Sequence, residues 1–331
     1  MREVVEVINK YGLGTAFVLD ERGVLLASVT DGDVRRALLA GHSLDSPASK
    51  SFNTQYWAIV SGEDAPATAY ESPGPTTDFP VVDSEGRLVC VDAYPRNNRE
   101  LSRENKVVIM AGGKGLRLRP LTESRPKPLL EIGGKPMLEH IIENLAREGF
   151  VNISVAINYL GGQIEDYFGN GSNFGVQISY LREEKELGTA GGLSLLSDPG
   201  SLPLVLMNGD LVLGASVGKM VDYHGKKEAD ITVGAKVIET TIPYGVLSAQ
   251  GEVIRSIEEK PIYTDLANVG VYVMNPSVVA SVPFNRAIDM PELILQHVEG
   301  GKVLAFPIHE TWADLGRHAD LQRADKLLSG D

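Results

Sequence analysis

Glycine and basic side chains gather in residues 111–122, directly after a short apolar run at 107–110. Glycine has no side chain to obstruct an anion, so backbone N–H groups of such a loop can face phosphate oxygens. Six basic residues stand against two acidic ones between positions 114 and 135, although the whole chain carries a net charge of −13. That overall charge would repel a phosphate-bearing ligand unless positive charge were concentrated where it binds. The sequence therefore predicts a phosphate site, with main-chain contacts from Ala111, Gly112, Gly113 and Gly115.

Two well-known phosphate loops do not fit this spacing. The dinucleotide-binding pattern needs a third glycine where Leu118 stands. A P-loop needs Ser or Thr after Gly133-Gly134-Lys135, where the chain has Pro136. The loop is therefore expected to hold phosphates in another arrangement.

Two aspartates occupy positions suited to a metal ion. Asp210 follows the apolar run 204–207, and Asp314 lies in a turn before the last predicted helix. The single cysteine, Cys90, excludes a cysteine-rich zinc site, and the six histidines show no metal-binding spacing. Carboxylates are ligands that Mg²⁺ prefers. We predict that Asp210 and Asp314 hold Mg²⁺ against a triphosphate.

Two cations complete the candidate catalytic set. Lys127 stands between Pro126 and Pro128, whose rings restrict the backbone and suit a lysine that presents its charge in fixed geometry. Arg117 can stabilise a pyrophosphate leaving group. Nucleotidyl transfer needs positioning and charge stabilisation more than covalent help, so no protein nucleophile is required.

A second glycine-rich segment, residues 188–192, opens a helical stretch. Backbone N–H groups at Gly188 and Thr189 could contact the base or ribose of a nucleotide. Tight packing at the start of a helix explains the same glycines equally well.

From residue 106 onward, short apolar runs alternate with helical stretches. Strands are predicted at 107–110, 153–157, 204–207, 231–237 and 269–274, and helices at 137–145, 162–168, 189–196 and 217–226. This alternation predicts a Rossmann-like α/β domain with a mixed, mostly parallel sheet. In such sheets ligands bind at the carboxyl ends of the strands.

The composition is that of an ordinary globular protein, with 43% apolar and 23% charged residues. The apolar runs are far shorter than the roughly 20 residues that cross a bilayer, and no secretory signal opens the chain. We therefore expect a cytoplasmic protein without a membrane or nucleic-acid partner.

The first third of the chain contains a degenerate internal repeat. Residues 17–26 line up with residues 80–89 at a constant offset of 63 positions. Each copy predicts strand, tight turn, strand, which is the pattern of a β-hairpin. A helix is predicted after the first copy, where Asp31 or Asp33 can cap it.

This repeat resembles a pair of cystathionine-β-synthase (CBS) motifs. Such pairs bind adenine nucleotides through a Thr-x-x-Asp element that grips the ribose, and Thr30 and Asp33 match that element. The second copy has Ala93 and Arg96 at the same offset, so the resemblance implies one regulatory site per chain. Capping of a helix explains Thr30 and Asp33 about as well.

The resemblance to a CBS pair covers roughly residues 1–95, as a small α+β module. CBS pairs tend to associate with one another, which implies a homo-oligomer. Residues 96–105 are polar and charged, as an inter-domain linker requires, and residues 106–331 form the second predicted domain.

Residues 106–331 resemble the sugar-phosphate nucleotidylyltransferases, whose five signature elements all occur in order. They are the glycine-rich loop at 112–118, Pro126-Lys127-Pro128, Asn208-Gly209-Asp210, Glu259-Lys260-Pro261 and Trp312-Ala313-Asp314-Leu315-Gly316. The resemblance implies a nucleoside triphosphate and a sugar 1-phosphate as substrates. It also implies that Lys260 holds the sugar phosphate, that Glu259 accepts from sugar hydroxyls, and that Gly245 and Asn268 lie near the sugar. One departure is Leu116, where the family usually has threonine.

A CBS pair ahead of such a transferase most resembles the glucosamine-1-phosphate guanylyltransferases of bacterial legionaminic acid synthesis. This implies transfer of GMP from GTP to glucosamine 1-phosphate. A heptose-1-phosphate guanylyltransferase and a glucose-1-phosphate thymidylyltransferase stay open, because no single residue of the sequence distinguishes guanine from the other bases. The alternative from another class is a nucleotide-sensing regulator without turnover. The complete set of Lys127, Asp210, Lys260 and Asp314 argues against that alternative.

Overall fold

The computed structural model describes residues 1–11, 14–56, 58–61, 76–95, 102–316, 320–321 and 324. The chain divides into two compact units. The first comprises Met1–Arg99 and Val237–Ala267, and the second comprises Glu100–Lys236 and Asn268–Asp331. The predicted domain boundaries stay predictions, and residues 96–101 of the predicted linker lie outside the described residues. In the part of the chain that the structure describes, no helix has the length and apolar content needed to span a bilayer.

Within the described residues of the second unit, strands assemble into one central sheet. In spatial order they are β10 (Gln177–Arg182), β9 (Asn152–Ile157), β6 (Val107–Met110), β11 (Leu204–Asn208), β16 (Ile262–Met274), β13 (Ile231–Thr241) and β17 (Val303–Ile308). β10, β9, β6 and β11 run parallel to one another. β11 and β16 are antiparallel, and β13 and β17 are parallel. The predicted mixed, mostly parallel sheet is confirmed. Because β10, β9, β6 and β11 are parallel, their carboxyl ends meet at one edge.

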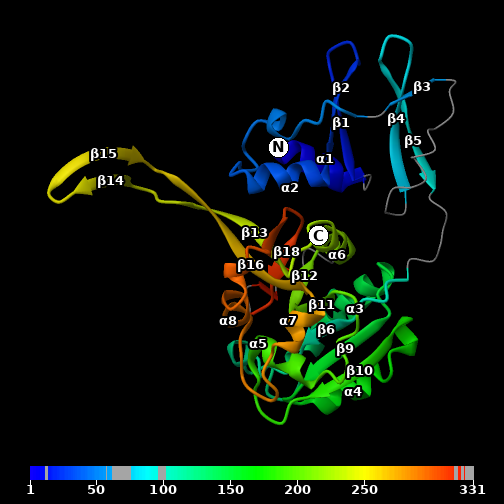
Figure 1. The fold of residues 1–331 in the computed structure, drawn as a ribbon, viewed down its shortest axis with the longest axis vertical. Helices are drawn as coiled ribbons and strands as arrows, with labels where there is room; N and C mark the ends of the chain where they lie inside the picture. The colour runs from blue at the N-terminus through cyan, green and yellow to red at the C-terminus, as the bar shows by residue number, and fades with distance from the viewer. Residues whose placement is uncertain are drawn as a thin grey trace. The chain divides into compact units, whose positions relative to one another are not determined.

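Apolar side chains alternate between the two faces of this sheet. In β6, Val107 and Ile109 face one apolar core and Val108 faces the other, and all three are fully buried. The helices that cover the first core are α3 (Met137–Arg147), α4 (Gly161–Phe168) and α6 (Val217–Lys226), and those that cover the second are α5 (Gly188–Gly191), α7 (Pro276–Ala280) and α8 (Met290–Leu295). Figure 1 shows these strands with the helices packed around them. With both faces covered, the ends of the strands are left to bind a ligand.

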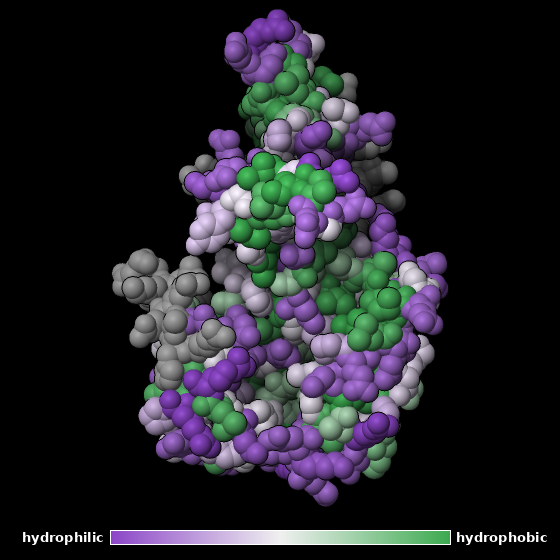
Figure 2. All heavy atoms as spheres, turned by 90° about the vertical axis from the view of Figure 1, so that its left-hand side faces the viewer, coloured by the Kyte–Doolittle hydropathy of each residue, from purple (hydrophilic) through white to green (hydrophobic). Residues whose placement is uncertain are grey.

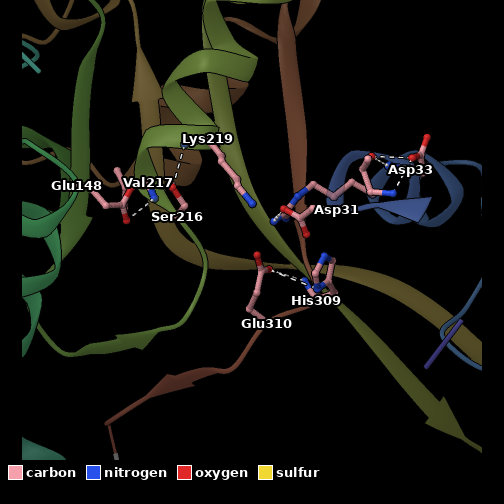
Figure 3. Close-up of polar contacts among 10 residues, drawn as sticks. Asp31, Asp33, Glu148, Ser216, Val217, Lys219, His309 and Glu310 are labelled. Atoms are coloured by element: carbon pink, nitrogen blue, oxygen red, sulfur yellow. Dashed lines mark hydrogen bonds and ion pairs between the residues drawn. The ribbon is translucent and has the colours of Figure 1, made fainter. Parts of the chain in front are cut away.

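Helix α6 begins at an acidic cap that comes from the end of α3. The Glu148 carboxylate accepts hydrogen bonds from Ser216 Oγ (2.7 Å), Val217 N (3.2 Å) and Gly218 N (2.6 Å) (Figure 3). Ser216 Oγ in turn accepts one from Lys219 N at 3.1 Å. A negative charge at this position satisfies N–H groups that the first turn leaves free and complements the helix dipole. The cap therefore fixes the start of α6 to the end of α3.

A small antiparallel pair follows β11 in the chain. It consists of β12 (Leu211–Leu213) and β18 (Trp312–Asp314), and its register places Leu211 opposite Asp314. Leu315 N donates to Asp210 O at 3.0 Å, and Trp312 Nε1 donates to Val269 O at 3.1 Å. The late Trp-x-Asp-x-Gly turn is thereby brought beside the end of β11.

Short elements fill the connections. They are the 3₁₀ helices η1 (Ala48–Ser51), η3 (Leu116–Leu118), η4 (Lys127–Leu129), η5 (Ser172–Phe174), η6 (Gly192–Leu195) and η7 (Val298–Gly300), and the hairpin of β7 (Glu131–Ile132) with β8 (Lys135–Pro136).

The two hairpins predicted from the internal repeat are present in the first unit. Its elements are α1 (Arg2–Tyr11), β1 (Thr15–Leu19), β2 (Leu25–Thr30), α2 (Asp31–Leu39), β3 (Ile59–Val60), β4 (Thr76–Val82) and β5 (Leu88–Pro95). β1 pairs with β2 and β4 pairs with β5, both antiparallel. The two turns are joined, since Leu25 N donates to Gly86 O and Leu88 N donates to Gly23 O, each at 3.0 Å. The assignment of these hairpins to a CBS pair stays a prediction, and Arg96 lies outside the described residues.

The other segment of the first unit, residues 237–267, carries a hairpin of β14 (Gly245–Gln250) and β15 (Val253–Glu259). Its register places Leu247 opposite Ile257 and Ala249 opposite Ile254. Leu247, Ile254 and Ile257 are each more than half exposed. Figure 2 shows apolar side chains at this hairpin as a green patch turned toward the viewer.

Candidate functional site

A cleft of about 550 Å³ opens at the carboxyl edge of the central sheet, within the second unit. Most of the residues predicted to bind a nucleotide or to take part in catalysis line it. They are Ala111, Gly112, Gly113, Gly115, Arg117, Lys127, Gly188, Thr189, Asp210 and Asp314. The structure thus brings together residues as far apart in the sequence as Ala111 and Asp314, although their individual roles stay predictions.

The glycine-rich loop follows β6 directly and has two kinds of glycine. Gly115 is left-handed (φ 61°), and a methyl group there would lie 2.8 Å from Thr122 Cγ2 and 3.1 Å from Lys127 Cβ. Thr122 Oγ1 also donates to Gly115 O at 2.9 Å. A methyl group on Gly113 would have no neighbour within 4 Å. Gly115 therefore fixes the turn against the Lys127 segment, whereas Gly113 leaves open space in which a phosphate can approach the backbone.

The basic stretch after the glycines is attached to the loop that precedes α4 and to α4 itself. Tyr159 OH donates to Glu123 O and Gln163 Nε2 donates to Ser124 O, each at 3.0 Å. Leu116 is 58% exposed and lines the cleft, where the resemblance leads one to expect a threonine. These contacts hold the loop that presents Arg117 to the cleft.

Asp210, Asp314 and Lys127 form one charged group. The pairing of Leu211 with Asp314 places the two aspartates beside each other, and Lys127 Nζ makes a very short ion pair with Asp210 Oδ2. Although Asp314 keeps access to solvent, desolvation of its carboxylate raises its pKa, and neighbouring Asp210 raises it further against the opposing effect of Lys127 and Arg117. Two adjacent carboxylates repel each other when both are ionised, and the neighbouring cations do not fully offset this repulsion. Their oxygen atoms are a donor set that fits a divalent cation.

The glycines of segment 188–192 are accounted for by packing. A methyl group on Gly188 (φ 76°) would lie 2.7 Å from Asp289 Oδ1, and one on Gly191 would lie 2.6 Å from Arg286 O. Thr189 N and Oγ1 both donate to Asp289 Oδ1, at 2.9 and 3.1 Å. Gly188 and Thr189 nevertheless line the cleft, so this segment both packs against Asp289 and forms part of the cleft wall.

The residues predicted to bind the sugar phosphate are not among those that line this cleft. Gly245, Glu259 and Lys260 belong to the segment 237–267 of the first unit, where Gly245 pairs with Glu259 at the base of the hairpin. Lys260 has a left-handed backbone (φ 48°), which is strained for a residue with a side chain. Asn268, in the second unit, donates from Nδ2 to Tyr272 OH at 2.8 Å and accepts from Gly270 N at 3.0 Å.

The residues predicted to bind a regulatory nucleotide form a helix cap. Thr30 is the N-cap of α2, with Thr30 Oγ1 accepting from Asp33 N at 3.3 Å and Asp33 Oδ2 accepting from Thr30 N at 2.8 Å. Thr30 Oγ1 also lies 2.6 Å from Asp33 Oδ2, and Arg36 makes a very short ion pair with Asp33 Oδ1. Figure 3 draws dashed contacts at the labelled Asp33. The interpretation of Thr30 and Asp33 as a helix cap is therefore confirmed, with Thr30 as the N-cap and Asp33 closing a capping box, whereas neither Asp31 nor Asp33 is itself the N-cap.

Comparison with known proteins covers most of the second unit and also the segment 237–267 of the first unit. A family model described as nucleotidyl transferase matches residues 106–329. The chain belongs to the nucleotidyl transferase family. The match includes the glycine-rich loop, the central sheet and both aspartates of the cleft.

Relatives of this nucleotidyl transferase are named for different bases. A mannose-1-phosphate guanylyltransferase of Mycobacterium tuberculosis is 31% identical over 232 residues, which is 67% of this chain and 64% of the relative. A UTP–glucose-1-phosphate uridylyltransferase of Synechocystis is 31% identical over 244 residues, which is 66% of this chain and 62% of the relative. The matched region thus spans less than two thirds of the length of these curated relatives.

A similar fold occurs in a crystal structure from Bacillus anthracis, of a protein named as a glucose-1-phosphate thymidylyltransferase. It is 26% identical, with a TM-score of 0.56, and the comparison covers 68% of this chain and 96% of that one. Sequence identity alone therefore leaves the base open, since relatives of similar identity are named for guanine, uracil and thymine.

Two cleft carboxylates of this nucleotidyl transferase, Glu183 and Glu186, were missed from the sequence. Glu183 lines the cleft and comes directly after β10. A strand at 177–182 was not predicted, so nothing marked the residue behind it as a strand-end position. The available signal was the alternation of polar and apolar residues in Gln177–Arg182.

Proposed function

We propose that this chain transfers GMP from GTP to a hexose 1-phosphate, giving a GDP-sugar and pyrophosphate. The observation that carries the proposal is the grouping of Lys127, Asp210 and Asp314 beside an open glycine-rich loop, at the carboxyl edge of the sheet. The guanine base is favoured by the relative from M. tuberculosis, which is named a guanylyltransferase. Two acceptors need comparison: mannose 1-phosphate, in the name of that relative, and glucosamine 1-phosphate, which the predicted architecture favours.

The reaction requires in-line displacement at phosphorus. A phosphate oxygen of the sugar 1-phosphate attacks the α-phosphorus of GTP, and the bond from that phosphorus to the oxygen bridging to the β-phosphate breaks. The electron pair of that bond leaves with pyrophosphate. Backbone N–H groups near Gly113 would bind the phosphates, and Arg117 would stabilise the negative charge that builds up on the leaving group.

Asp210 and Asp314 would hold Mg²⁺, which is consistent with two crowded carboxylates of which one has a raised pKa. When bound, Mg²⁺ would supply charge neutralisation at the phosphate oxygens. Lys127 is buried, with 9% of its surface exposed, and its contact with Asp210 orients both side chains toward the cleft. Its charge would then help to hold the triphosphate in the geometry that reacts.

Lys260 and Glu259 are proposed to bind the sugar phosphate and the sugar hydroxyls, with Gly245 and Asn268 near the sugar. The strained backbone at Lys260 supports a functional position, because such strain persists mainly where function requires it.

The proposal is tested by pyrophosphate release from five nucleoside triphosphates, each combined with mannose, glucosamine and glucose 1-phosphates in the presence of Mg²⁺. We expect the highest kcat/KM with GTP and one of the hexose 1-phosphates, and loss of turnover when EDTA removes divalent cations. Binding of nucleotides without pyrophosphate release from any pair would instead support a regulator that has kept the fold.

A further inference from the structure

One ion pair in the cleft has no part in the proposed reaction. Lys114 Nζ lies 2.7 Å from Glu186 Oε1, and both residues line the cleft. Lys114 belongs to the glycine-rich loop after β6, whereas Glu186 belongs to the segment between β10 and α5. The ion pair therefore links two stretches of chain that both border the space where a nucleotide is proposed to bind.

Each partner of this ion pair is next to a residue that the fold holds in place. The residue after Lys114 is Gly115, whose left-handed turn is tightly packed against its neighbours. The residue after Glu186 is Leu187, which is fully buried and whose carbonyl oxygen accepts a hydrogen bond from Ile288 N at 3.0 Å. Because both backbones are anchored beside the ion pair, rotation of the two side chains is sufficient to open it.

The ion pair is also exposed enough to exchange its partners. Solvent reaches 47% of the Lys114 side chain and 66% of the Glu186 side chain. Exposed ion pairs contribute little net free energy, because water and salt screen them. Lys127, by contrast, is buried where it pairs with Asp210. Of these two lysines, Lys114 is the one that can change partner with little loss of free energy.

The charges of the cleft oppose a triphosphate while this ion pair stays closed. In the described part of the chain, three cations and four carboxylates line the cleft, which leaves one excess negative charge when all are ionised. They are Lys114, Arg117, Lys127, Glu183, Glu186, Asp210 and Asp314. A triphosphate is itself strongly negative, so it binds only where positive charge becomes available to it. A lysine that exchanges its carboxylate for a phosphate supplies such a charge.

We infer that Lys114 leaves Glu186 and pairs with the triphosphate when a nucleotide binds in this cleft, so that Glu186 competes with the ligand for the lysine. The inference rests on the proposed function only in taking a nucleoside triphosphate as the ligand. Lys114 stands between the fixed Gly115 and Gly113, where open space lets a phosphate approach the backbone. Its ammonium group has three donors and can bind phosphate oxygens beside the main-chain N–H groups.

The test measures binding of GTP with Mg²⁺ to the full-length protein by titration calorimetry, without sugar phosphate. Lys114→Met keeps most of the side-chain length and removes its charge, so it should weaken binding about 10-fold. Glu186→Gln keeps the shape of the side chain and releases Lys114, so it should tighten binding about threefold. Lys185→Met and Glu184→Gln alter exposed neighbours outside the cleft lining and should bind as the wild type does.

The double variant separates competition for Lys114 from simple repulsion of the ligand by Glu186. If Glu186 acts through Lys114, Glu186→Gln gains no affinity in a Lys114→Met background. A gain of the same size in both backgrounds overturns the inference, and so does Lys114→Met that binds GTP as tightly as the wild type. These variants are judged by binding alone. A protein that shows the expected shifts but releases no pyrophosphate with any pair of substrates therefore overturns the proposed function and keeps the inference, whereas a wild type that binds no triphosphate overturns both.

Discussion

Two clusters of polar side chains, one in each unit, look alike in the sequence and differ in the structure. Thr30 ends β2 and Asp33 lies in the first turn of α2, while Glu183 lies between the end of β10 and the start of α5. In the first cluster the Thr30 hydroxyl and the Asp33 carboxylate hydrogen-bond to each other and to the backbone. Arg36 forms an ion pair with the same carboxylate. In the second cluster one carboxylate oxygen is buried without a described partner. Polar groups whose hydrogen bonds are complete stabilise the fold, whereas those left incomplete indicate where a ligand binds.

The comparison has a direct consequence for variants. Substitutions in the cleft should change turnover or nucleotide affinity and leave the free energy of unfolding nearly unchanged. Substitutions in the capping box should do the reverse. Kinetic and stability measurements on variants of either unit can contradict this expectation.

The largest effect is expected for Asp210→Asn. Loss of a carboxylate beside Asp314 removes a ligand of the proposed metal, so kcat should fall roughly 1,000-fold while the fold is kept. Steady-state kinetics at saturating Mg²⁺ and a thermal melt measure the two quantities. Asp166→Asn, at an exposed position on α4, is the matched control and should retain wild-type turnover. Turnover of Asp210→Asn near that of the control would exclude Asp210 as a metal ligand.

The next effect separates the two lysines. Lys127→Ala should lower kcat/KM for GTP roughly 100-fold, because Lys127 lines the nucleotide cleft. Lys260→Ala should mainly raise the KM for the sugar 1-phosphate, because its role is proposed on the sugar side. Initial rates with each substrate varied in turn distinguish the two. Equal defects in both KM values for both variants would remove the assignment of the lysines to different substrates.

The same contrast explains how much of the fold could be predicted. The central strands β6, β9 and β11 were predicted because buried parallel strands are short continuous apolar runs. The unpredicted strands β10 and β17 are the two edges of the sheet. Polar residues such as Gln177 interrupt β10, so its sequence lacks a continuous apolar run. β17 does begin with an apolar run at 303–306, and Pro307, which an edge strand tolerates, ends that run.

The candidate site also could be predicted only where a local sequence pattern marks its residues. Residues with a local signature, such as the glycines before Gly115 and Lys127 between prolines, could be placed at the cleft from sequence. Glu183 could not, because its position depends on β10 and its significance depends on which atoms surround it. Conversely, Gly188 and Gly191 are explained largely by contacts with residues about 100 positions away, which no local pattern reveals.

The smallest effect is expected at the capping box and bears on whether the first unit binds a nucleotide. Thr30→Ala removes the side-chain acceptor for Asp33 N and leaves the start of α2 with one more unsatisfied N–H, so the free energy of unfolding of this unit should fall by about 1 kcal/mol. Thr30→Ser keeps the hydroxyl and should restore most of the loss. Turnover should be unchanged in both, as measured beside chemical denaturation.

A ribose that bound Thr30 and Asp33 would have to replace the hydrogen bonds between them. An adenine nucleotide can therefore bind there only if its contacts exceed those of the intact cap, and it can alter turnover only if it binds two states of the protein unequally. Calorimetry with AMP and ATP on the full-length wild type, Thr30→Ala and Thr30→Ser decides between the two roles. Because the cap is complete, we expect no saturable binding that depends on Thr30. Binding to the wild type and Thr30→Ser that is lost in Thr30→Ala would show that a complete cluster can also be a ligand site, and would restore the proposed regulatory role of this unit.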